Sequence, residues 1–109
     1  MEDEKLDINM VAMNVILNAG DGRVLVDKAL DCMAAFDFDG AEKNLAEADA
    51  KILKAHQSQT ETIQRQAAGE DVEYSLLFTH AQDTLMTISS EYRIAKRMLP
   101  IVRALAAKS

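Results

Sequence analysis

Two residues in an almost uncharged stretch of the chain have side chains that can do chemistry. His80 and Asp83 lie three residues apart within residues 74–90 (YSLLFTHAQDTLMTISS), where Asp83 is the only formal charge, although 28% of the whole chain is charged. A neutral histidine has one free ring nitrogen that can attack phosphorus, while a partner holds the other N–H. His80 is therefore a candidate nucleophile. The alternative is a histidine that only hydrogen-bonds within a packed helix.

Three other polar side chains could support such a nucleophile. His56 is the only other histidine, and it could orient His80, bind an incoming phosphoryl group, or merely pack. Gln59 follows it by three residues and adds hydrogen-bond donors, whereas Gln82 lies on another side of its helix and is the weaker candidate. The ligands are too few for a zinc site. Neither a glycine-rich phosphate loop nor a nucleophile-elbow motif is present.

The composition predicts an all-α fold with a single domain spanning residues 1–109. Ala, Leu, Met, Glu, Lys and Gln dominate, and no alternating β-branched run suggests a strand. Two breaks leave three long helices, over residues 5–35, 39–68 and 73–107. Short connections make consecutive helices antiparallel neighbours, which predicts a three-helix antiparallel bundle. Pro100 should kink or loosen the last two turns of the third helix.

Each break offers two candidate residues to begin the next helix. At the first break Asp37 or Asp39 can act as the N-cap. At the second break Gly69 is a helix stop, and Asp71 or Ser75 can then cap the third helix.

Apolar residues at helical spacing predict the core. The second helix carries its stripe through His56 and Gln59 to Ile63, with charged residues on its other faces. The stripes comprise Ile8, Val11, Val15, Val26, Ala29 and Met33; then Phe38, Ala41, Leu45, Ala48 and Ile52; then Ala81, Leu85, Ile88, Tyr92, Ala95, Leu99 and Val102.

The third helix has a second stripe without long charged side chains. It consists of Leu76, His80, Asp83, Thr87, Ser90 and Ile94, at alternating spacings of three and four residues. A helix that lacks a charged face is buried on more than one side, so we expect this stripe to meet other copies of the chain. Converging Asp83 carboxylates about 5 Å apart would repel by roughly 3 kcal/mol, so they need protons or a cation such as Mg²⁺. The alternative is an Asp83 that hydrogen-bonds locally, without a metal.

Charge and composition exclude several classes of protein. The net charge is −6, and only residues 91–109 are basic, at +4, so the chain is a poor nucleic-acid binder. No apolar run reaches the length of a membrane-spanning helix. Cys32 is alone and no export signal precedes it, so we expect a reducing cytoplasm.

Four segments, in order, resemble one known family. HAQDTLMT, residues 80–87, is similar to the phosphorylation-site segment of the lactose/cellobiose (chitobiose) type IIA proteins of the bacterial phosphoenolpyruvate-dependent sugar phosphotransferase system. NAGDGR, residues 18–23, resembles the family's first-helix motif. FDFDGAEKNLAEADAKILKAHQSQT, residues 36–60, resembles its second helix, and AGE, residues 68–70, its second turn.

The resemblance implies a fold, a role and partners. It implies three antiparallel helices per chain and a homotrimer that forms a nine-helix bundle. It implies that His80 accepts a phosphoryl group from the phosphocarrier protein HPr and passes it to a cysteine of the cognate IIB component. It also implies that three copies of Asp83 surround one metal ion per trimer, usually Mg²⁺. The sugar would be a disaccharide such as cellobiose, chitobiose or lactose.

The chain departs from the family pattern at two positions. Thr84 stands where the family commonly has a second histidine, and Gly22 where it usually has alanine.

Two rival functions have different signatures. A non-catalytic helical oligomer acting as an adaptor would function without His80. A two-component histidine phosphotransfer domain typically shows H-x-x-K-G, and no lysine follows His80 here.

Overall fold

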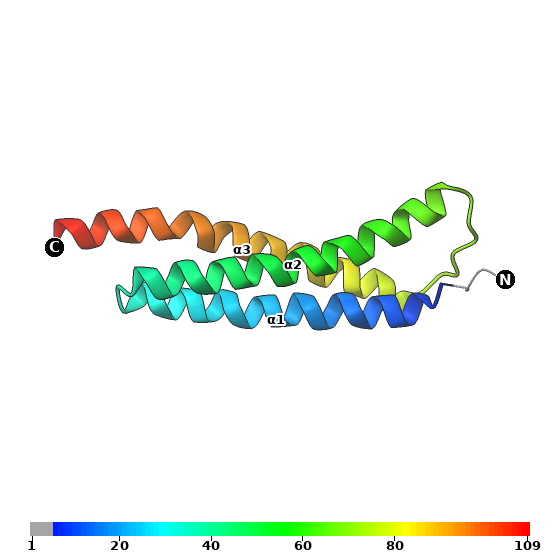
Figure 1. Cartoon of the computed structure of the whole chain (residues 1–109), viewed down its shortest axis with the longest axis horizontal. Helices are drawn as coiled ribbons and strands as arrows, with labels where there is room; N and C mark the ends of the chain where they lie inside the picture. The colour runs from blue at the N-terminus through cyan, green and yellow to red at the C-terminus, as the bar shows by residue number, and fades with distance from the viewer. Residues whose placement is uncertain (1–5) are drawn as a thin grey trace.

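The computed structural model describes residues 6–109 and consists of three long helices (Figure 1). These are α1 (Ile8–Ala34), α2 (Phe38–Ala67) and α3 (Leu76–Lys108). Consecutive helices run in opposite directions, so the predicted three-helix antiparallel bundle is confirmed, and α1 and α3 run the same way (Figure 1). The described chain measures 63 × 20 × 20 Å. The expected helix start at residue 5 lies outside the described residues.

A polar side chain caps the start of each helix. Asp7, Asp37 and Ser75 each accept a hydrogen bond from the backbone N–H three residues further on, at 3.2, 3.0 and 3.1 Å. These bonds satisfy one of the N–H groups that a helix leaves without a partner in its first turn. The structure therefore selects Asp37 over Asp39 and Ser75 over Asp71.

The turn after α1 closes on a residue in the left-handed conformation. Phe36 has φ of 58°, where glycine is the usual residue. The N–H of Asp37 donates to the carbonyl of Cys32 at 2.8 Å, and the N–H of Phe36 donates to Met33 at 3.0 Å. This pair of bonds is a Schellman motif, and it satisfies the last carbonyls of α1.

The turn after α2 has the same form, with the glycine that the sequence predicted. Gly69 has φ of 94°. The N–H of Glu70 donates to the carbonyl of Arg65 at 3.1 Å. The side chains of these two residues also pair, at 2.5 and 2.7 Å. A longer connection follows this turn and ends at Ser75, which caps the start of α3.

The core follows the predicted stripes in α1 and α3 but not throughout α2. In α2 the stripe through His56 and Ile63 is wrong, because both side chains are exposed, while Ala55 and Thr62 are buried instead. A helical stripe can continue from Ile52 by three residues or by four, and the packing against α1 and α3 selects the shorter step.

Gly22 lets α1 and α2 approach closely. A Cβ at this position would lie 2.9 Å from Cγ1 of Ile52, which is itself buried.

Further along the chain, α3 continues through Pro100 to Lys108. Within residues 6–109, no helix combines the length and the apolar character needed to cross a bilayer.

Candidate functional site

His80 lies near the start of α3, with its side chain exposed to solvent. Its backbone carbonyl accepts a hydrogen bond from the Thr84 hydroxyl at 2.9 Å. The hydroxyl that stands where the family commonly has a second histidine is therefore turned back onto the helix backbone. Among the described residues, no hydrogen bond or ion pair engages the imidazole ring of His80 itself, so the ring is free to meet a partner.

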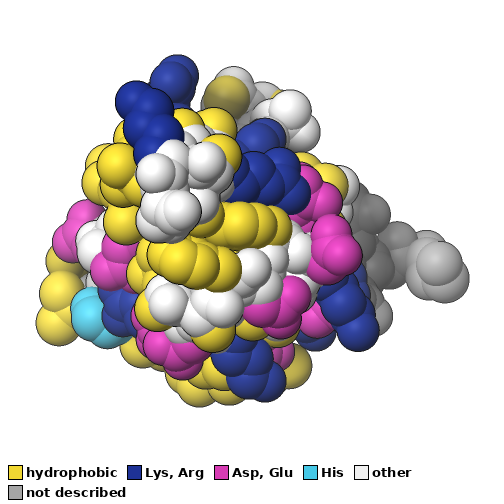
Figure 2. Space-filling view, turned by 90° about the vertical axis from the view of Figure 1, so that its left-hand side faces the viewer, with side chains coloured by type: hydrophobic (Ala, Val, Ile, Leu, Met, Phe, Trp, Pro, Cys, Tyr) yellow, Lys and Arg dark blue, Asp and Glu magenta, His cyan; other side chains and the backbone are white. Residues whose placement is uncertain are grey.

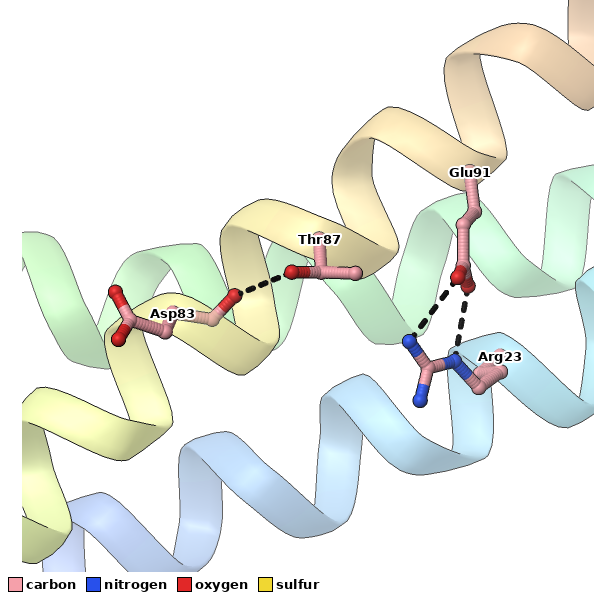
Figure 3. A network of polar contacts seen from close by, with 4 residues as sticks. All are labelled: Arg23, Asp83, Thr87 and Glu91. Atoms are coloured by element: carbon pink, nitrogen blue, oxygen red, sulfur yellow. Dashed lines mark hydrogen bonds and ion pairs between the residues drawn. The ribbon is translucent and has the colours of Figure 1, made fainter.

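Asp83 lies one turn further along the same face and is also exposed. The hydroxyl of Thr87 donates to its backbone carbonyl at 2.9 Å. The Asp83 carboxylate points away from this contact and away from Glu91 (Figure 3). In the part of the chain that the structure describes, no three His, Cys, Asp or Glu side chains gather into a metal-binding group. One chain therefore presents one carboxylate.

An ion pair joins α3 to α1 two turns beyond Asp83. The guanidinium of Arg23 donates to both carboxylate oxygens of Glu91, at 2.9 and 3.1 Å (Figure 3). The hydrogen bond to Glu91 raises the pKa of Arg23 above its usual value, and the nearby carboxylate of Asp27 adds to this effect. The bidentate pair links α1 to α3, and the buried side chains of α3 fix which face of that helix turns outward.

The second stripe of α3 is exposed along its whole length within the chain. Leu76 is 72% exposed and Ile94 is 62% exposed, and the four polar residues between them are exposed as well. The other two helices of the chain therefore leave this stripe uncovered, and its contact with other copies stays a prediction. We call this stripe, together with its continuation through Met98, Ile101 and Leu105, the α3 seam. These three continuing residues are exposed by 39, 59 and 63%.

The end of the molecule that holds the α1–α2 turn and the end of α3 is also rich in exposed apolar surface. Figure 2 looks onto this end and shows hydrophobic side chains beside Lys and Arg side chains. Phe36 stacks on Phe38 with ring centroids 6.0 Å apart, and Arg103 lies 5.5 Å above the Phe38 ring. Arg103 also pairs with Glu42. These contacts tie α3 to the start of α2.

His56 is not brought to His80 within the chain. Its Nε2 lies 3.2 Å from the hydroxyl of Ser89, nine residues beyond His80 on α3. At 1.5 Å per residue this is about 14 Å along the helix axis. The His56 side chain therefore joins α2 to α3 at the middle of the bundle.

The two glutamines predicted as supporting residues also lie off the His80 face. Gln59 continues the buried stripe of α2 between Ala55 and Thr62, and its Oε1 is buried with no hydrogen-bond partner among the described residues. Gln82 lines a groove beneath the connection from α2 to α3, together with Thr62. Neither glutamine shares a face with the imidazole.

Sequence reasoning missed a second apolar surface, on the outer side of α1. Met10, Met13, Leu17 and Val24 are exposed by 69, 44, 61 and 54%. Their spacing of three, four and seven residues was the signal that could have revealed them, because it matches that of the α3 seam. Close to His80, Leu76 is widely exposed, while Leu77 and Phe78 pack against the core.

Most of the chain is similar to IIA components of bacterial sugar phosphotransferase systems. Residues 10–103 match the family model described as PTS system, lactose/cellobiose-specific IIA subunit, where PTS is the phosphotransferase system. The lactose-specific EIIA component of Lacticaseibacillus casei is 35% identical over 107 residues, which cover 95% of this chain and 96% of that protein. The lichenan-specific phosphotransferase enzyme IIA component of Bacillus subtilis is 34% identical over 95 residues, covering 87% and 86%.

Solved structures agree with this similarity. The cellobiose-specific enzyme IIA from Bacillus anthracis superposes with a TM-score of 0.89 at 31% identity, over 97% of both chains. A solution structure of the chitobiose IIA–HPr complex of Escherichia coli superposes with a TM-score of 0.79 at 25% identity. That match covers 94% of this chain and 99% of the other.

Proposed function

This chain belongs to the lactose/cellobiose-specific IIA subunit family of the sugar phosphotransferase system, and on that premise we propose that His80 accepts and passes on a phosphoryl group. The donor is the phosphocarrier protein HPr, and the acceptor is a cysteine of the cognate IIB component. The observation that carries the proposal is the exposed imidazole of His80 within the matched segment, on a helix face with a single charge. One structural relative was solved as a complex with HPr.

The chemistry is two successive in-line displacements at phosphorus. In the first, a ring nitrogen of His80 forms a bond to phosphorus while the bond between phosphorus and HPr breaks. In the second, the cysteine sulfur of IIB forms a bond to phosphorus and the His80 nitrogen leaves. Little covalent chemistry is left to the protein beyond positioning, so an imidazole on a rigid helix with open access suits the role. The exposed Leu76 beside it gives apolar docking surface to both partners.

Three copies of the chain complete the assembly in this proposal. The exposed Asp83 carboxylate, whose oxygens make no hydrogen bond in the described chain, fits the oxygen ligands that Mg²⁺ prefers. One chain supplies one carboxylate, and a three-fold seam would supply three, with water filling the remaining positions. The ion would neutralise the repulsion between these carboxylates and hold the α3 helices together. Asp83 would do no acid–base work.

Intact-mass spectrometry after incubation with phosphoenolpyruvate, enzyme I and HPr tests the proposal. We expect one added, acid-labile phosphoryl group on the wild type and none on His80→Ala. If a folded trimer gains no mass, the phosphocarrier function is wrong for this chain, and a non-catalytic adaptor becomes the better account. The transported sugar is expected to be a disaccharide such as cellobiose, chitobiose or lactose, with the carrier acting in the cytoplasm.

A further inference from the structure

We propose that Arg97 from three copies of the chain forms an anion-binding site on the same assembly axis as Asp83, and that the site takes an oxyanion of the phosphate class. The inference rests on the three-copy assembly in the proposed function. It concerns Arg97, which lies beside Ser90 and Ile94 of the α3 seam and away from His80, and it requires no phosphoryl transfer.

The register of α3 places the two layers on one line. Asp83, Ser90 and Arg97 follow one another at intervals of seven residues. A straight α-helix drifts by about 20° per seven residues, so Arg97 lies about 40° around the helix from Asp83, and a slight left-handed supercoil removes that difference. At 1.5 Å per residue the two layers are about 21 Å apart. If three Asp83 carboxylates face a common axis, three Arg97 guanidiniums face it too.

The surface around Arg97 offers donors to a negatively charged ligand. A shallow groove on α3 is lined by Ser90, Arg93, Ile94 and Arg97. Two guanidiniums and one hydroxyl are available to donate hydrogen bonds to a ligand, and none of the four side chains carries a negative charge. The planar guanidinium matches the paired oxygens of phosphate, which makes arginine the preferred residue for such anions.

The two arginines of this groove are not paired with a carboxylate of their own chain among the described residues. Arg93 and Arg97 take part in no ion pair among the residues that the structure describes, and the nearby carboxylate of Glu91 is held by Arg23. Four other cations of the chain do pair with carboxylates: Arg23, Lys51, Arg65 and Arg103. Arg93 and Arg97 therefore bring two cations without a paired carboxylate in the described chain to the groove where copies would meet.

Assembly of three chains would favour a bound anion at this layer. Three guanidiniums that approach one axis would repel one another and lose contact with water. The same holds for the three negatively charged Asp83 carboxylates. One bound oxyanion accepts hydrogen bonds from all three and removes the repulsion. The α3 seam would then hold a cation at one layer and an anion at another.

Isothermal titration of the assembled wild-type protein with inorganic phosphate tests the site, with the trimer verified by sedimentation equilibrium in the same buffer. We expect one phosphate per three chains. Arg97→Gln should lower the affinity at least tenfold while leaving a trimer, and Arg97→Lys should lower it less. Lys96→Gln is the matched control, because it removes the same charge one residue away on another face, and it should bind phosphate as the wild type does.

Three results would overturn the anion site. These are a trimer that binds no phosphate, equal binding by wild type and Arg97→Gln, and an equal loss in Lys96→Gln. The last two would assign the binding to general positive charge or to another surface. If a carboxylate of a neighbouring copy pairs with Arg97, the trimer binds no phosphate and Arg97→Gln weakens assembly. His80 phosphorylation is measured separately, so its failure with intact phosphate binding would sink only the carrier role.

Discussion

The imidazole Nε2 of His56 lies 3.2 Å from the hydroxyl oxygen of Ser89 and so connects α2 to α3. This contact lies about 14 Å along α3 from His80, from the rise of 1.5 Å per residue. The two histidines of the chain therefore have different positions and, we infer, different roles. His80 is open to partners, and His56 helps to hold two helices together.

Replacing His56 by alanine should leave phosphorylation at His80 intact. The variant loses one exposed hydrogen bond, which contributes below about 1 kcal/mol to the free energy of unfolding. Ser89→Ala should cost a similar amount, and the double variant should cost little more than either single change. Intact mass after incubation with HPr and urea denaturation measure the two effects. A His56→Ala protein that folds but takes no phosphoryl group would return His56 to the site.

Gly22 and Gly20 should respond in opposite ways to alanine. Nothing lies within 4 Å of a Cβ at Gly20, so Gly20→Ala should stabilise α1 by about 0.5–1 kcal/mol. At Gly22 the new Cβ would lie 2.9 Å from Cγ1 of the buried Ile52. Overpacking of this kind costs about 1–3 kcal/mol, so Gly22→Ala should destabilise the protein. Equal stabilisation of both variants in thermal unfolding would contradict the close approach of α1 and α2.

Phe36 should be better replaced by glycine than by alanine. Both changes remove the ring that stacks on Phe38, but only glycine adopts φ of 58° without strain. We expect Phe36→Gly to be more stable than Phe36→Ala by about 1 kcal/mol. Denaturant midpoints of the two variants measure the difference. If the alanine variant were the more stable, the left-handed turn at this residue would be wrong.

Glu70 should contribute to stability only above acidic pH. The hydrogen bonds from Arg65 hold the pKa of Glu70 below its usual range. A carboxylate with a lowered pKa in the folded state stabilises the protein above the pKa of the unfolded chain, about 4.3 for glutamate. That contribution is lost as the pH falls through the folded value. Glu70→Gln should therefore be less stable than the wild type at pH 7, with the difference vanishing in acid.

Glu73 provides the control for this pH profile. It lies in the same connection and is in none of the ion pairs found among the described residues. Glu73→Gln should follow the wild-type dependence of unfolding free energy on pH. If both glutamine variants reduced the loss of unfolding free energy at acidic pH by the same amount, the effect would come from net charge and not from the pair with Arg65.

The apolar end of the α3 seam should stabilise the assembly without a metal. Ile101→Ser and Leu105→Ser remove exposed apolar side chains that would be buried between copies, so they should shift the protein toward monomer in sedimentation equilibrium. Leu53→Ser is the matched control, because Leu53 is 53% exposed on the outer side of α2. If all three variants assembled alike, this part of α3 would not lie between copies.

The sequence was sufficient for the three helices and for a second stripe on α3 that lacks long charged side chains, whose contact with other copies stays a prediction. The near absence of long charged side chains around His80 and Asp83 marks a helix face that the sequence alone separates from the charged, solvent-facing surfaces. His56 was misplaced because steps of three and four residues from Ile52 are both helical, and only the positions of α1 and α3 choose between them. The left-handed conformation of Phe36 could not be predicted either, because the residue expected at such a position is glycine and not phenylalanine.

The exposure of the α3 seam makes the amount of protein a control on what it can bind. In the proposed assembly, a layer that needs three chains would exist only in the trimer, and the ratio of trimer to free chain would rise with the square of the free-chain concentration. While most chains are free, a twofold drop in concentration would lower that ratio about fourfold. His80 belongs to each chain, whereas the proposed Asp83 and Arg97 layers would belong to the assembly. Gene dosage and dilution would therefore act on ion binding more steeply than on the number of phosphorylatable histidines.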